Sequence, residues 1–159
     1  MATPKYTALA EYTAVSADGS ITFASIPATY RDLMLVISGA ASNIVNVIVR
    51  LNGDSGTNYS SVIAEGNGTS GTSFSATDAV PEVGRMSTSE SNTIIEIMDY
   101  SVTDKHTTIL GRGNSNGDLV RMSATRWANT AAVTSVTILS LPSGRTFNTG
   151  TTICLYGVK

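Results

Sequence analysis

The feature that most constrains this chain is the two-residue period of its apolar positions. Tyr6, Ala8, Ala10 and Tyr12 fall on one face of an extended segment, and similar alternation recurs along most of the sequence. Successive side chains of a strand point to opposite faces of a sheet, so this period indicates β-strands. Because no segment has a 3.6-residue period long enough for a helix, the sequence predicts an all-β protein.

Turn-forming residues separate these segments at intervals of roughly 8–12 residues, which is typical of a β-sandwich or jelly roll. The Asn52-Gly53 pair is a strong hairpin signal between two apolar segments. Segments 32–38, 44–51, 93–100 and 151–158 have the length and apolar content of strands. We therefore expect an antiparallel β-sandwich or jelly roll of eight to ten strands.

Two segments rich in small and polar residues are predicted to interrupt this pattern. Residues 65–92 contain many Gly, Ser, Thr and Asn residues, together with Pro81. This composition predicts a long functional loop, or a segment that hides a weak strand. Residues 111–117 predict a second loop, which closes a strand at 106–110.

The chain length of 159 residues fits one domain with a substantial core. We expect residues 1–20 to form an N-terminal arm or a first strand, and residues 21–159 to form a single jelly-roll domain. No linker or repeat of fixed period divides the sequence.

Charged residues make up only 14% of the chain, against about 25% in an average soluble domain. Hydroxyl groups take their place, on 20 Ser and 22 Thr. The net charge of −2, with three Lys and seven Arg scattered singly, argues against a nucleic-acid partner. A nearly neutral surface also gives little repulsion between molecules, so we expect the chain to associate within an assembly.

Targeting signals and disulfides are not predicted. The first residues lack the pattern of a signal peptide, and no apolar run approaches the roughly 20 residues of a membrane helix. The single cysteine, Cys154, cannot form an internal disulfide. We expect synthesis in a reducing cytoplasm without export, and no membrane partner.

Candidate catalytic patterns are weak in this sequence. Residues 66–71 match GxGxxG, but that motif binds dinucleotides only where it opens a helix, so a loop is expected. His106 is the only histidine, and no GxSxG nucleophile motif accompanies it. One histidine and one distant cysteine fall short of a zinc site. We expect no enzyme activity, no cofactor and no metal.

Four residues are candidates for contact with a ligand or partner. Trp127 could form a stacking platform for a sugar or an anchor in the core, and Arg126 is its neighbour. Tyr59 and Asn67 lie at the start and just after the end of another expected strand. These residues leave glycan binding open.

Four short blocks resemble a family of small virion proteins of tailed bacteriophages. They are residues 23–33 (FASIPATYRDL), residues 51–60 with Leu-Asn-Gly-Asp and Asn-Tyr-Ser, residues 129–137 (NTAAVTSVT) and residues 155–159 (LYGVK). The resemblance implies a jelly-roll structural protein, commonly trimeric, and supplies no catalytic residues. It implies either a decoration (cement) protein bound to the major capsid protein of the head, or part of the tail-fibre apparatus.

Three functions therefore remain open at the level of the sequence. The leading hypothesis is a capsid decoration protein that stabilises the outer head shell of a virion. A tail-fibre or receptor-binding tip would instead contact host glycans through loop residues. A free carbohydrate-binding module would bind sugar without any virion.

Overall fold

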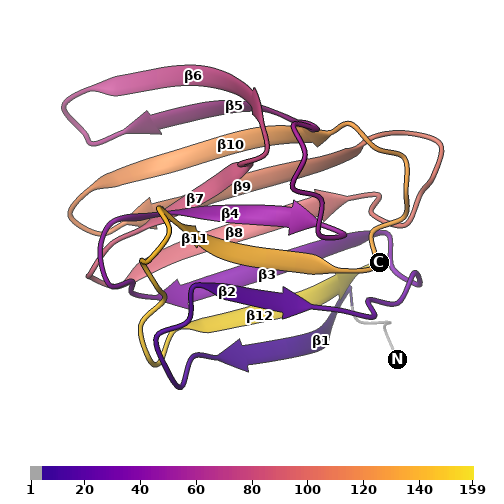
Figure 1. Ribbon diagram of the computed structural model, residues 1–159, viewed down its shortest axis with the longest axis horizontal. Coiled ribbons are helices and arrows are strands. Elements are labelled where there is room, and N and C mark those ends of the chain that lie inside the picture. The colour runs from indigo at the N-terminus through magenta and orange to yellow at the C-terminus, as the bar shows by residue number, and fades with distance from the viewer. Residues whose placement is uncertain (1–4) are drawn as a thin grey trace.

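The computed structural model describes residues 5–159, which form twelve β-strands and no helix. Eight strands build one sheet and four build a second, and the two sheets pack face to face (Figure 1). The predicted all-β sandwich is confirmed, and its twelve strands exceed the eight to ten expected. Residues 1–4 of the predicted N-terminal arm lie outside the described part of the chain.

Neighbouring strands run antiparallel throughout both sheets. In spatial order, the eight-stranded sheet contains β1 (Tyr6–Thr13), β12 (Thr152–Val158), β3 (Asp32–Gly39), β8 (Ser91–Met98), β9 (Thr107–Ser115), β10 (Leu119–Trp127), β5 (Tyr59–Gly66) and β6 (Gly71–Asp78). The four-stranded sheet contains β2 (Ser20–Phe23), β11 (Val136–Leu141), β4 (Val45–Leu51) and β7 (Glu82–Met86).

The core lies between the sheets, where alternate side chains of the predicted apolar strands meet. Leu33, Leu35 and Ile37 of β3 are fully buried, and they belong to the same core cluster as Val47 and Val49 of β4 in the other sheet. Each such side chain contributes about 1.5–3 kcal/mol when it is removed from water. The strands with the clearest alternation therefore form the best-packed part of the molecule.

The long-loop interpretation of residues 65–92 is wrong, and the alternative that this segment hides a strand is confirmed, because two strands lie within it. β6 and β7 lie inside the segment, β5 extends into it to Gly66, and β8 begins in it at Ser91. β6 pairs with β5 but is exposed on both faces, and the β5–β6 hairpin projects past the four-stranded sheet (Figure 1). Because β6 buries neither face, it needs no alternating apolar residues, and so the sequence pattern does not reveal it as a strand.

The expected 111–117 loop is also wrong, since β9 continues through Gly111 and Gly113 to Ser115. A Cβ added to Gly111 would lie 2.0 Å from the carbonyl oxygen of Val83 in β7. One added to Gly113 would lie 2.3 Å from the carbonyl oxygen of Asn92. Glycine in this strand marks a close approach of backbones rather than a turn.

Candidate binding surface

Trp127 and Tyr59 are core residues and offer no stacking platform. They are paired across β10 and β5, and their exposed fractions are 1% and 0%. The Trp127 indole Nε1 donates to the Asp54 carboxylate at 2.7 Å, while the Tyr59 hydroxyl accepts from the Leu51 amide at 3.0 Å. Burial raises the pKa of Tyr59 to about 12. The sugar-platform alternative for Trp127 is therefore wrong.

Arg126 and Asn67 are placed far apart by the structure. Arg126 is exposed on β10 and donates to the Ser60 hydroxyl at 3.3 Å. Asn67 lies in the β5–β6 turn, where its Oδ1 accepts from the amides of Thr69 and Ser70 at 3.0 and 2.9 Å. The GxGxxG segment is thus a hairpin turn, and the four candidate residues do not form one site.

The sequence blocks 23–33, 51–60, 129–137 and 155–159 meet at one end of the sandwich. Asn52 donates to the carbonyl of Ala132, and its Oδ1 accepts from the amide of Thr134 at 2.8 Å. The amide of Ile26 donates to the carbonyl of Thr134 at 3.0 Å. The ring of Tyr30 leaves no room for a Cβ on Gly157. These motif residues hold the fold together and do not converge on a ligand.

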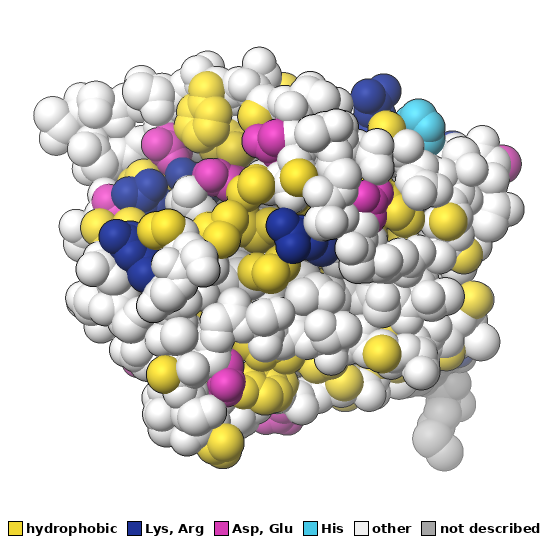
Figure 2. Space-filling view, viewed as in Figure 1, with side chains coloured by type: hydrophobic (Ala, Val, Ile, Leu, Met, Phe, Trp, Pro, Cys, Tyr) yellow, Lys and Arg dark blue, Asp and Glu magenta, His cyan; other side chains and the backbone are white. Residues whose placement is uncertain are grey.

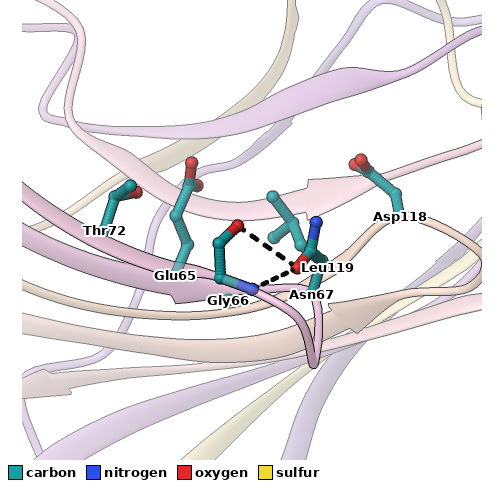
Figure 3. A pocket seen from close by; sticks show the side chains of 7 residues that line it. Glu65, Gly66, Asn67, Thr72, Asp118 and Leu119 are labelled. Carbon is teal, nitrogen blue, oxygen red and sulfur yellow. Dashed lines mark hydrogen bonds between the residues drawn. The ribbon is translucent and has the colours of Figure 1, made fainter.

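A small open hollow of about 180 Å³ lies beside the β5–β6 turn. Glu65 and Thr72 stand on the hairpin, and Asp118 lies on the other side of the hollow (Figure 3). His106 precedes β9, at the opposite end of that nine-residue strand from Asp118, which is a separation of roughly 25–30 Å. A His-based acid or base therefore cannot reach this hollow.

The carboxylates around this hollow are held in ion pairs. Arg121, 3% exposed, bonds Glu65 at 2.6 Å and Glu82 at 2.7 Å, and so ties β10 to β5 and to β7 of the other sheet. Arg85 likewise bonds Asp118. Figure 2 shows charged side chains of both signs gathered near β7 and the β5–β6 hairpin. These ion pairs make the carboxylates structural links between strands of the two sheets.

Neither a metal-binding cluster nor a membrane-spanning helix is found among the described residues. Within residues 5–159, no three His, Cys, Asp or Glu side chains gather closely enough to hold a metal ion. None of the secondary structure in this range is a helix that could cross a membrane. The hollow is best explained as the edge of a structural ion network.

The outer face of the eight-stranded sheet carries an apolar band that the sequence pattern did not predict. Strand register places two neighbouring rows of side chains across the sheet, from β12 to β5. The apolar members of these rows are Cys154, Val36, Ile94, Met122 and Ala64, and then Tyr156, Met34, Leu110, Ala124 and Val62. One ion pair, between Glu96 and Arg112 at 3.1 Å, interrupts the band near its middle.

The rows on either side of the apolar band are mostly polar. One contains Thr152, Ser38, Asn92 and Asn114 and ends at the exposed Val120, and the other contains Asp32, Thr108, Arg126 and Ser60 together with Val158 and Met98. An apolar centre with a polar rim is the usual anatomy of a protein–protein interface. The arrangement suits a flat protein partner better than a small ligand.

At β10 and β5 the usual polarity of a sandwich is inverted. Arg121, Ser123 and Thr125 of β10 point inward and are buried, whereas Val120 and Met122 point outward with exposed fractions of 59% and 62%. The inward-facing Ser61 of β5 bonds Thr125 at 2.9 Å, and Val62 is exposed. Residues 119–127 alternate in the sequence, but the sequence does not indicate that the polar side chains point inward and the apolar side chains point outward.

A scan against protein-family models, a search of curated proteins and a search of solved structures each find no match for the chain.

Proposed function

We propose that the chain is a structural protein of a tailed-bacteriophage particle, where it decorates the outer shell of the head. The observation that carries this proposal is the apolar band on the outer face of the eight-stranded sheet. Exposed Val62 and Met122 of this band lie over a layer that buries hydroxyl groups and the charge of Arg121. A chain that exposes its apolar face in this way gains free energy when a partner covers it.

The size of this face supports a protein partner. Strands about 4.8 Å apart, with about seven residues each at about 3.3 Å per residue, give eight strands an area of roughly 900 Å². Stable protein complexes bury about 800 Å² on each partner. One sheet face is therefore large enough to hold the chain on a shell.

The phage assignment draws on the four blocks that resemble phage virion proteins. A decoration protein needs no reaction chemistry, because it acts by binding the assembled shell more tightly than its free subunits. Such binding shifts the assembly equilibrium toward the shell by mass action. Many copies on one lattice strengthen the effect when they also contact one another.

Purified shells lacking the protein, taken from the phage that encodes it, provide the test. We expect the chain to sediment with these shells and the double variant Val62→Lys, Met122→Lys to stay in solution. The matched control is Ser20→Lys, Thr22→Lys, which adds the same charge to exposed positions on the other sheet and should still bind. Equal binding of both variants would show that the band is not the attachment face.

A further inference from the structure

The free edge of β6 differs from the other three sheet edges of the sandwich. β1 has a bulge between Ala8 and Ala10 and carries Glu11, while β2 is only four residues long. β7 has five residues, two of them charged, and an irregular register with β4. Bulges, short strands and charges are the devices that prevent edge-to-edge pairing.

β6 has none of these devices. It spans eight residues, GTSFSATD, without proline or lysine, and its one charge is at the last position. Its register with β5 is unbroken from the Tyr59–Asp78 pair to the Gly66–Gly71 pair. A long, regular and nearly uncharged edge is suited to pairing with another strand.

The hydrogen-bond pattern identifies which groups face this edge. The Asn67 amide donates to the Ser70 carbonyl at 3.1 Å, and on the other side of β5 the Ala128 amide donates to the Asn58 carbonyl at 2.7 Å. Backbone groups of antiparallel strands alternate in direction. Positions 72, 74 and 76 therefore bond to β5, and the amides of Ser73, Ser75 and Thr77 point outward.

We propose that two copies of the chain associate through antiparallel pairing of their β6 strands, with Phe74 opposite the Phe74 of the second copy. In this register the outward backbone amide and carbonyl of Ser73 bond to those of Ser75 in the second copy. Phe74 then lies at a non-hydrogen-bonded position. Side chains approach most closely at such positions. The Phe74 ring, 42% exposed in the single chain, would then be covered by its counterpart.

Charge complementarity favours a second copy as the partner. In the antiparallel arrangement the two Asp78 carboxylates lie at opposite ends of the paired strands, so they do not repel each other. The seven remaining residues of β6 are uncharged, and serine and threonine pairs form hydrogen bonds across strands. The other long edge, β1, is a poorer partner because its bulge and Glu11 break the pairing. This inference does not depend on the proposed function.

Cysteine cross-linking tests the register. In a Cys154→Ser background, Phe74→Cys should form a disulfide-linked dimer under mild oxidation with glutathione disulfide. Thr72→Cys, on the same face of the same strand, should remain monomeric because its counterpart would lie roughly 13 Å away. Equal cross-linking of both variants, or efficient linking of a Glu11→Cys chain to a Ser75→Cys chain, would overturn the proposal.

Sedimentation equilibrium of the full chain tests the association itself. Because one strand edge is small beside a standard interface, we expect a dimer that dissociates on dilution. Ser75→Pro removes an outward amide without removing a bond to β5, so it should fold normally and stay monomeric, while Ser75→Thr should still dimerise. A wild-type chain that is monomeric at every concentration, or a trimer unaffected by Ser75→Pro, would overturn the proposal.

Discussion

The indole of Trp127 lies inside the sandwich and donates its one hydrogen bond to Asp54 at the rim. Trp127→Ala would leave a large cavity beside Tyr59, and we expect a loss of about 3–5 kcal/mol in the free energy of unfolding. Trp127→Phe keeps most of the ring but removes the donor, and should cost about 1–3 kcal/mol. Urea denaturation measures both losses, and an unchanged stability for Trp127→Ala would contradict a core role.

The carboxyl group of Asp54 gives this cluster a pH dependence. Partial burial raises its pKa, but hydrogen bonds from Trp127, Asn58 and the Gly56 amide outweigh burial and lower the pKa below its ordinary 3.8. A lowered folded-state pKa stabilises the fold above the unfolded value, and that stabilisation is lost as the pH falls through the folded value.

Asp54→Asn should therefore be less stable than the wild type at neutral pH, and the difference should shrink as the pH falls below 3.8. Urea unfolding over a pH series measures the difference. Asp104→Asn, at an exposed turn position, serves as the control and should show little change in stability at any pH. A gap between Asp54→Asn and wild type that widens on acidification would contradict this assignment.

Arg121 forms ion pairs with the carboxylates of both Glu65 and Glu82. Arg121→Met would leave Glu65 and Glu82 without their guanidinium partner in a largely buried position. Breaking such a pair on one side typically costs about 3–5 kcal/mol. Thermal unfolding should show this loss, and adding Glu65→Gln and Glu82→Gln to Arg121→Met should recover part of it. No recovery in the triple variant would show that Arg121 acts through packing rather than charge.

Among the strands, β9 requires glycine at position 111 because the backbone of β7 passes very close to it. Gly111→Ala would place a Cβ against the Val83 carbonyl, so we expect a loss of about 3 kcal/mol or more in unfolding free energy. Gly71→Ala is the control, because its Cβ would meet nothing closer than 3.6 Å. Chemical denaturation of the two variants gives the comparison, and similar stabilities would contradict the close approach.

Sequence patterns predicted the strands that bury at least one face with apolar side chains. β3, β4, β8 and β12 lie within a residue or two of their expected limits. The wrongly predicted segments have a common physical cause. β6 buries neither face, and β9 uses glycine where two backbones nearly touch, so both resemble turns in the sequence.

The binding surface was less predictable than the fold. Met122 and Val62 are apolar residues in alternating strands, and sequence alone would assign them to the interior. Their outward direction depends on Arg121, Ser123 and Thr125 finding partners or tight packing inside the sandwich. Such tertiary pairing is not encoded in the period of one strand.

Considered as a whole, the molecule is a flat sandwich with one apolar sheet face and one unprotected edge. We propose that the apolar face binds the shell and that the β6 edge joins two copies of the chain. Location on the particle separates this account from its rivals, because a tail-fibre tip would leave the head bare and a free carbohydrate-binding module would leave the whole virion unlabelled.

Immunogold electron microscopy of intact virions, with antibody raised against this chain, shows where the protein lies on the particle. For a head decoration protein we expect gold distributed evenly over the head, and loss of that label from particles whose chain carries Val62→Lys and Met122→Lys. Gold confined to the tail, or no gold on the virion at all, would rule out head decoration.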